Sequence, residues 1–249
     1  MDDPHGTGRF LSAEWRFLAM LNYAIDPLAL QPYLPRGTEL DTWQGRHYVS
    51  IVGFLFLDTR VRGVPIPFHR DFEEINLRFY VRRKAADGWR RGVVFIKEIV
   101  PRWAIATTAR VVYNENYVAR PMRHRLDRRA NAPHLLRRDS EVEYGWREHG
   151  RWQSIRVTIT GDAEPAPSGS EAEFITEHYW GYAAQRDGGC VEYRVEHPSW
   201  LVWRCRAASF VCDVATVYGA RFAAALEQPP SSTFVAAGSP IVVRRGVTI

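Results

Sequence analysis

Within the segment from Phe72 to Arg83, apolar and polar side chains alternate from Glu74 to Arg82. Successive residues of a β-strand point to opposite faces, so this period of two predicts a strand with one buried apolar face. Ala86-Asp87-Gly88 then predicts a turn. The apolar face consists of Ile75, Leu77, Phe79 and Val81, and the opposite face of Glu74, Asn76, Arg78, Tyr80 and Arg82.

Further short segments of this kind follow along the chain. Val93–Val100 is apolar on nearly both faces, and Glu141–Arg147 and Trp152–Thr160 predict a hairpin across His149-Gly150. Phe10–Tyr23 has no clean period. Other strands are expected within 41–57 (two, joined at Gln44-Gly45), 107–117, 191–195, 200–206 and 240–245.

Three helices are expected between these strands. A short one lies within 26–34, a second starts at the capping box Ser170-Glu171-Ala172-Glu173 and runs to Trp180, and a third covers Asp213–Leu226. Many short strands with few helices predict a β-dominated α+β fold, built as a barrel or a curved antiparallel sheet. We expect one domain over residues 1–249.

The composition favours a soluble protein with a large core. Aromatic residues make up 13% of the chain, and each buries a large area. The longest apolar stretch, about Tyr48 to Leu57, is too short to cross a bilayer, and the polar N-terminus lacks the features of a secretory signal. Three cysteines without a CxxC pair fit a reducing compartment. We expect a cytoplasmic protein without a membrane partner, and the oligomeric state stays open.

The formal net charge of +5 raises the question of nucleic-acid binding. The densest basic cluster lies between Arg120 and Arg138, but no helix-turn-helix, zinc-finger or RNP pattern accompanies it. A solvated arginine-rich face explains such a cluster, so we expect no nucleic-acid partner.

Sequence motifs of the common catalytic and cofactor sites are absent. The chain contains no GxGxxG, P-loop, HExxH or GxSxG pattern, and none of its eight histidines is paired at the spacing of a zinc site. His178 and His197 stand out by their surroundings, although a lone histidine in such a place usually serves as a structural hydrogen-bonding group. We expect neither a metal nor a diffusible cofactor.

Lys97 is an unusual cation in this chain. Only two of the 33 basic residues are lysines, and Lys97 stands inside the apolar segment Val93–Val100. Burial disfavours the ammonium form, which lowers the pKa of a lysine and makes its amine a nucleophile toward carbonyl groups. The alternative is that the side chain reaches solvent at a strand edge. We carry Lys97 as a candidate catalytic residue.

Glu74 and Arg78 share the polar face of the strand at 72–83. If that face lines a barrel lumen, the two residues place a carboxylate and a cation in a confined site. If it faces water, they are ordinary surface residues. Periodicity does not choose between the two.

Several segments spread over nearly the whole chain resemble the uncharacterised YqjF-like family. They include Trp15-Arg16, Leu21-Asn22-Tyr23, Tyr48-Val49-Ser50, Phe68 to Arg78, Glu177 to Tyr182, His197 to Trp200 and Ala237 to Pro240. This family has no general assigned activity, so the resemblance by itself implies no reaction.

The YqjF-like family is in turn distantly similar to acetoacetate decarboxylase, which has a β-barrel-centred fold and a Schiff-base lysine in an enclosed cavity. Phe72-Glu73-Glu74 matches the decarboxylase segment that carries a functional glutamate. Two other positions depart from the decarboxylase. Ala24 stands in place of a substrate-binding arginine, and Tyr117 in place of the lysine when Ala109-Arg110-Val111 is matched to the catalytic stretch.

The resemblance therefore implies an acetoacetate-decarboxylase-like barrel with a cavity for a small organic acid or carbonyl compound. Glu74, Lys97 and Tyr117 are the candidate catalytic residues, and Arg78, Arg110 and Tyr113 the candidate ligand-binding residues. Tyr117 would act as hydrogen-bond donor or general acid, Glu74 as base or orienting group, and Arg110 as anion partner. Standard decarboxylation is disfavoured, because the expected lysine and arginine are missing. The alternatives are a non-catalytic sensor or carrier, and Schiff-base chemistry as a lyase or decarboxylase through Lys97.

Overall fold

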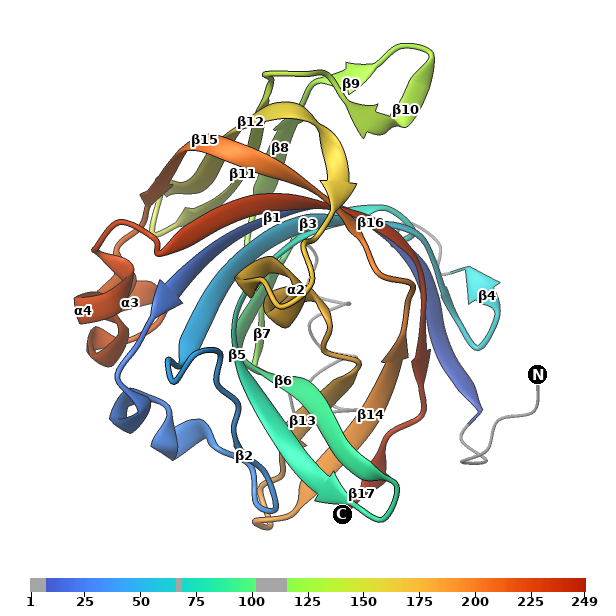
Figure 1. Ribbon diagram of the computed structural model, residues 1–249, viewed down its shortest axis with the longest axis vertical. Helices are drawn as coiled ribbons and strands as arrows, with labels where there is room; N and C mark the ends of the chain where they lie inside the picture. The colour runs from blue at the N-terminus through green and yellow to red at the C-terminus, as the bar shows by residue number, and fades with distance from the viewer. Residues whose placement is uncertain (1–7, 66–68, 102–115) are drawn as a thin grey trace.

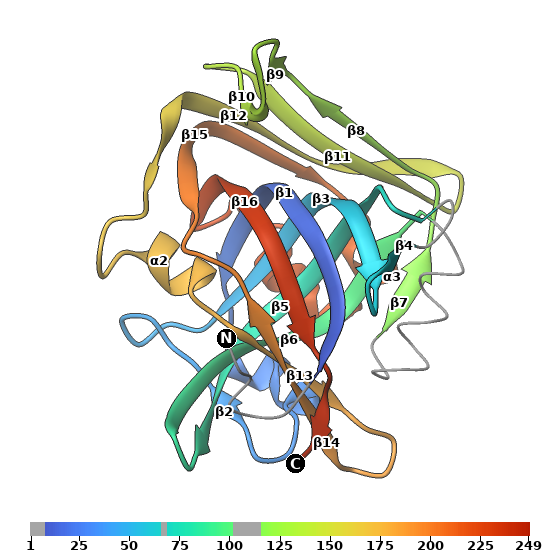
Figure 2. The ribbon, with the colours of Figure 1, turned by 90° about the vertical axis from the view of Figure 1, so that its right-hand side faces the viewer.

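The computed structural model describes residues 8–65, 69–101 and 116–249. Seven strands of this part of the chain close a barrel, which Figures 1 and 2 show from two directions. Each strand pairs with the next, and β16 pairs with both β14 and β1 to complete the ring. In order around the ring they are β1 (Arg9–Ala24), β3 (Tyr48–Val61), β5 (Phe72–Ala85), β6 (Gly88–Val100), β13 (Trp180–Ala184), β14 (Cys190–Glu196) and β16 (Ser232–Arg244). The predicted β-dominated barrel is confirmed.

The sheet continues beyond the barrel through the first half of β16. That half pairs with β15 (Leu201–Val211), and β12 (Arg151–Pro165), β11 (Glu141–Glu148) and β8 (Met122–Leu126) follow in order. These four strands form a layer against the outside of the barrel, which we call the outer layer (Figure 2). The last residues of β16 pair with β14 instead, so one strand serves both parts of the structure.

Shorter elements fill the ends of the barrel and the loops. α2 (Glu171–Thr176) lies over one end of the barrel in both views (Figures 1 and 2). None of the helices in the described ranges combines the length and apolar character that crossing a membrane requires. The remaining elements are β2 (Glu39–Leu40), β4 (Val64–Pro65), β7 (Tyr117–Ala119), β9 (Arg128–Arg129), β10 (Ala132–Leu136), β17 (Val247–Thr248), the helices α3 (Val214–Val217) and α4 (Ala223–Leu226), and the 3₁₀ turns η1 (Pro27–Ala29), η2 (Gln31–Tyr33) and η3 (Ala220–Phe222).

Both faces of the barrel wall are buried. On β5, Leu77 and Phe79 point outward into a core that they share with Tyr144, Trp146 and Ile155 of the outer layer. The inward residues belong to a second core, which fills part of the lumen with aromatic side chains and is closed at one end by α2. A strand that alternates apolar and polar residues therefore has no face toward bulk water here. Its polar residues lie inside the barrel.

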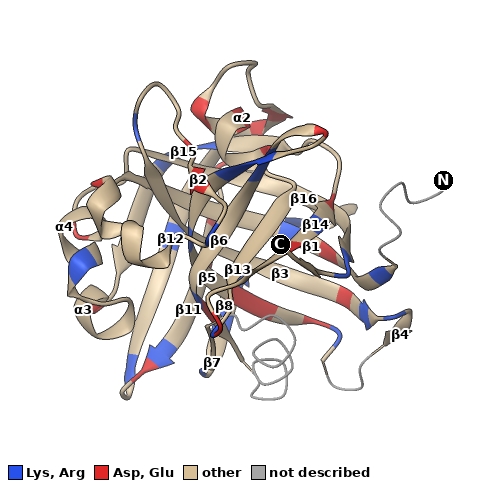
Figure 3. Ribbon diagram, turned by 90° about the horizontal axis from the view of Figure 1, so that it is seen from below, with Lys and Arg blue, Asp and Glu red and all other residues tan. Residues whose placement is uncertain are grey.

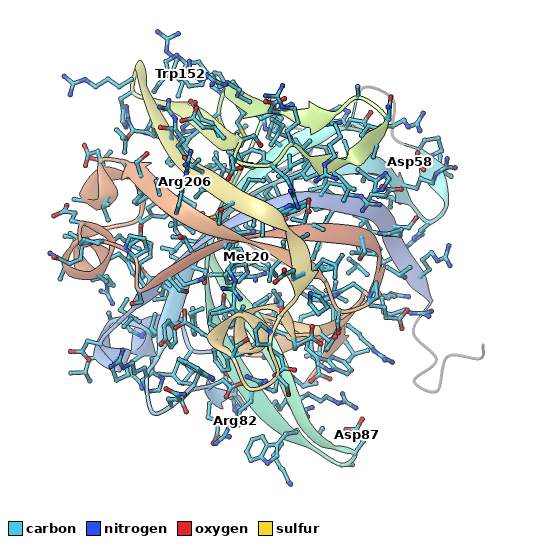
Figure 4. All side chains as sticks on the ribbon, turned by 45° about the horizontal axis from the view of Figure 1, so that its top comes forward. Met20, Asp58, Arg82, Asp87, Trp152 and Arg206 are labelled. Carbon is cyan, nitrogen blue, oxygen red and sulfur yellow. The ribbon has the colours of Figure 1, made fainter. Side chains whose placement is uncertain are left out.

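Charged residues of both signs are interspersed along the described chain (Figure 3). In the basic cluster between Arg120 and Arg138, arginines form ion pairs with carboxylates: Arg120 with Glu148, Arg123 with Glu143, and Arg125 with Glu141. Figure 4 places Asp87 at the tip of the β5–β6 hairpin and Trp152 at the far end of the outer layer. The absence of a nucleic-acid partner stays a prediction.

Several expectations about individual elements differ from the structure. Phe10–Tyr23 is the long strand β1, whose alternation is interrupted by register shifts and by a positive φ of 56° at Phe17. The helix expected over Asp213–Leu226 is three short pieces, because Gly219 at φ +102° ends the first turn. The capped helix at Ser170 ends at Thr176, and Trp180 begins β13.

Gly238 lies where β16 passes from the outer layer to the barrel, and its φ of +75° favours glycine. A Cβ atom at this position would lie 2.0 Å from the backbone oxygen of Trp15. We predict that Gly238→Ala lowers the free energy of unfolding by at least about 2 kcal/mol more than Gly188→Ala, measured by urea denaturation. Gly188 also has positive φ, +82°, but open space around it. Equal losses in the two variants would contradict this role of Gly238.

Candidate active site

The candidate site lies on the inward face of β5. Glu74, Asn76 and Arg78 alternate with outward apolar residues, and they are 2%, 2% and 8% exposed. Of the two alternatives left by the sequence, the structure therefore has the one in which this polar face lines the barrel lumen. The cavity around these residues has a volume of about 190 Å³. This is below the roughly 300–1,000 Å³ of pockets for drug-sized ligands, so only a small molecule fits.

A β-bulge in β6 adds a second carboxylate to the lumen. Leu77 pairs with Lys97, but the next residue, Arg78, pairs with Phe95, so β6 has one residue more than β5 at this point. Phe95 and Glu98 both line the cavity as a result, whereas Lys97 does not. Glu98 is 1% exposed and pairs in register with Asn76. Sequence reasoning missed Glu98, since a regular strand that places Phe95 inward would place Glu98 outward.

Most of the cavity wall is apolar. Aromatic side chains from β1, β3, β5 and β6 and from the segment after β14 surround the polar residues, which gather along β5 and β6. The aromatic residues include Trp15, Phe54, Phe56, Phe72, Phe95 and Trp200. Such a wall excludes water and strengthens the electrostatic interactions of the few polar groups inside.

Glu74 accepts hydrogen bonds at both carboxylate oxygens. Asn76 Nδ2 donates to Oε1 at 3.0 Å, and the Tyr117 hydroxyl donates to Oε2 at 3.4 Å. Tyr117 reaches this position because β7 pairs with β6, with Tyr117 in register with Glu98. A carboxylate in direct contact with a phenol hydroxyl is an arrangement that can give and take a proton.

Arg78 lies further along the same face of β5. Its Nη2 donates to the backbone oxygen of Ile175 at 3.5 Å, and the guanidinium lies 5.7 Å from the centre of the Tyr80 ring. Within the described residues no carboxylate forms an ion pair with Arg78, and its Nε has no hydrogen-bond partner. A buried charge without a counter-ion is unfavourable, which makes this guanidinium a candidate anion site.

His178 lines the cavity next to Arg78, and its ring lies close to the carboxylate of Asp41. The His178 Nε2 lies 3.4 Å from Asp41 Oδ2, and Arg91 Nε donates to the same oxygen at 2.7 Å. Burial lowers the pKa of His178 to about 4, with Asp41 opposing the shift and Arg91 and Arg78 adding to it. Burial also lowers the pKa of His197, to which Arg78 contributes. Both imidazoles are therefore neutral at pH 7, and Arg78 provides the positive charge in this part of the cavity.

The structure brings Glu74, Arg78 and Tyr117 together in one cavity, as the sequence analysis expected. Arg110 and Tyr113 lie outside the described residues. Their expected place in the cavity stays a prediction.

Lys97 is directed to the other side of the barrel wall. Its Nζ donates to the backbone oxygen of Val217 in α3 and lies 6.0 Å from the Tyr218 ring. Burial lowers the pKa of its amine, as the apolar sequence around it suggested, while Glu148 raises it. The condition for a catalytic role, a side chain pointing into the cavity, is not met in this structure.

Known proteins provide an independent comparison. Residues 12–240 match the family DUF2071, described as an "Uncharacterized conserved protein". The chain belongs to this family. It is also 25% identical over 206 residues to the uncharacterized protein YqjF of Bacillus subtilis (strain 168), a match that covers 82% of this chain and 80% of that protein.

Solved structures of acetoacetate decarboxylase-like proteins share the fold of this DUF2071 protein. An acetoacetate decarboxylase-like enzyme from Sphingomonas wittichii RW1 superposes with a TM-score of 0.65 at 13% identity, covering 97% of this chain and 94% of that one. The enduracididine biosynthesis enzyme MppR complexed with pyruvate gives 0.66 at 13% identity, covering 99% and 94%. The acetoacetate decarboxylase of Legionella pneumophila gives 0.64 at 14% identity, covering 100% and 92%. At these identities the likeness extends to the fold alone.

The burial of His178 has a consequence for stability as a function of pH. Because its pKa of about 4 in the folded protein lies below the ordinary value of 6.5, the unfolded chain binds the proton more readily. The stability that neutral His178 contributes is complete above pH 6.5 and is lost as the pH falls toward 4. We predict a loss on the order of 3 kcal/mol from this residue between these pH values, measured by urea unfolding at each pH.

His178→Asn removes this part of the pH dependence, whereas His134→Asn, at an exposed position on β10, leaves it in place. Asp41, whose pKa is lowered from 3.8 to about 2, contributes a loss only below pH 3.8 and does not overlap this range. An unchanged pH dependence in His178→Asn would contradict the assignment.

Proposed function

We propose that the barrel cavity binds a small organic acid or carbonyl compound and that Glu74 and Tyr117 transfer a proton to or from it. The observation that carries this proposal is Arg78, a buried guanidinium without a carboxylate partner among the described residues. A ligand carboxylate or a polarised carbonyl oxygen would complete its interactions, because the planar guanidinium matches such oxygens.

The remaining polar groups fit a proton-transfer role. The Glu74 carboxylate would act as base or orienting group, and the Tyr117 hydroxyl as hydrogen-bond donor or general acid toward the bound molecule. Arg110 and Tyr113 are proposed to complete the anion site from outside the described residues. This chemistry uses only side chains of the chain itself.

A sensor or carrier function is the second candidate. The largely aromatic wall of the cavity supports it, because an apolar pocket with few converging polar groups can bind a ligand without reacting with it. A carrier would keep its ligand through purification, and mass spectrometry of the extracted protein would find that ligand.

The role of Arg78 is tested by calorimetric titration with pyruvate and acetoacetate, two small acids that carry a carbonyl group. We expect Arg78→Met to weaken binding by about 30-fold or more, since it removes the charged partner of a buried carboxylate. The free variant should unfold at an equal or higher temperature, because a buried charge without a counter-ion has been removed.

The matched control is Arg82→Met on the same strand. Arg82 pairs with Glu39, and its side chain is 43% exposed and does not line the cavity. This variant should bind both acids like the wild type. Equal binding by all three proteins would exclude Arg78 as the anion partner.

Amine catalysis is tested separately by borohydride trapping. The chain has two lysines: Lys84 lies over the Trp89 ring and Lys97 binds the backbone of α3, and neither lines the cavity. We therefore predict that a panel of β-keto acids, ketones and aldehydes gives no reducible adduct on Lys97, read by intact-protein mass. An adduct that disappears in Lys97→Arg would revive Schiff-base chemistry and contradict the placement of this side chain.

A further inference from the structure

The orientation of the Asn76 amide gives information about the ligand. Its nitrogen donates to Glu74 Oε1, and Glu74 Oε2 accepts from Tyr117. Both oxygens of Glu74 act as acceptors, so Asn76 must present its amide nitrogen to Glu74. Exchanging the nitrogen and oxygen of the Asn76 amide would break this hydrogen bond. The amide oxygen is thereby directed away from Glu74.

That oxygen has no hydrogen-bond partner in the part of the chain that the structure describes, although Asn76 is 2% exposed. Buried acceptors are nearly always paired, either with protein or with water. In the lumen, water or a bound molecule can provide the missing donor. A ligand that displaces such a water without replacing its hydrogen bond loses affinity.

The two parts of the cavity therefore differ in hydrogen-bonding character. Near Arg78, the guanidinium Nε–H is a donor without a partner, and the buried imidazole of His178 lines the same part of the cavity. Near Asn76, the amide oxygen accepts, and the carboxylates of Glu74 and Glu98 lie on the same wall. Arg78 and Asn76 are two residues apart on one face of β5, so a single small molecule can contact both.

We propose that the cavity selects short organic acids that carry a hydroxyl or amino group in addition to the carboxylate. The carboxylate would bind Arg78, and the hydroxyl or amino hydrogen would be donated to Asn76 Oδ1. This inference rests on the proposed function and narrows its ligand class. Asn76 is a specificity-determining residue in this arrangement.

Two matched pairs of acids test the inference by calorimetric titration. Propionate is compared with 2-hydroxypropionate, and 4-methylpentanoate with 2-hydroxy-4-methylpentanoate, whose larger apolar part reaches the aromatic wall. In the wild type, the hydroxy acid of each pair should bind about tenfold more tightly or better, because only it satisfies the amide oxygen.

A variant at Asn76 assigns that preference to its amide oxygen. Asn76→Leu, which keeps the approximate shape, should abolish the difference between the members of each pair. Asn131→Leu, at an exposed position of the β9–β10 turn, should leave it unchanged. Thermal unfolding verifies that each variant is folded, and the wild-type comparison by itself still tests whether the cavity selects hydroxy acids.

The outcomes separate this inference from the proposed function. If none of the four acids binds while pyruvate or acetoacetate does, the proposed function stands and this inference is overturned; if no acid of either set binds, both are overturned. If both members of each pair bind the wild type equally, the proposed function stands and the selection by Asn76 is wrong. If the preference exists but persists in folded Asn76→Leu, another group provides it and the assignment to Asn76 is overturned.

Discussion

The shared strand β16 is the constraint on which the rest of the structure depends. It pairs with β1 over most of its length, while its other edge pairs first with β15 and then with β14. A strand has only two edges, so it can belong to both the barrel and the outer layer only if its second partner changes along its length. Gly238 lies where this change happens, in close contact with the backbone of Trp15. The barrel is closed and the outer layer is attached by the same thirteen-residue strand.

Burial of the barrel wall on both faces determines where polar chemistry can occur. The outer layer covers the apolar face of β5, so the polar face of that strand is enclosed as well. Glu74, Asn76 and Arg78 would be ordinary solvated residues on a sheet with one open face. Enclosed among aromatic side chains, the same residues interact with one another and with a ligand instead of with bulk water. The site therefore follows from the layer arrangement as much as from the residues themselves.

The sequence predicted the strands that alternate regularly and the one that is apolar on both faces, but it did not predict β1. The strand at 72–83 and the hairpin from Glu141 to Thr160 are present, because local period and turn residues specify them. β1 shows no clear pattern in the sequence, since its register shifts break the period of two. Whether the polar face of β5 points inward was not predictable, because periodicity identifies two faces without identifying their surroundings.

The bulge in β6 explains the misplaced lysine and the missed glutamate together. One additional residue exchanges the faces of all residues after it, so Lys97 leaves the lumen and Glu98 enters it. A bulge residue cannot be recognised from the sequence of an apolar segment, because both faces of that segment are apolar. Tyr117 came from the resemblance to acetoacetate decarboxylase, since β7 is too short to show a period.

The chain order of the barrel strands bears on how the protein folds. β1, β3, β5 and β6 are complete by residue 100, but the ring closes only through β13, β14 and β16, which lie between residues 180 and 244. Contacts of such large sequence separation form late, since a long loop must first be closed. During synthesis on the ribosome, the early strands have an unpaired edge and an uncovered aromatic surface until β16 has emerged. The interval before closure is therefore the period in which this protein is most exposed to aggregation and most in need of chaperones.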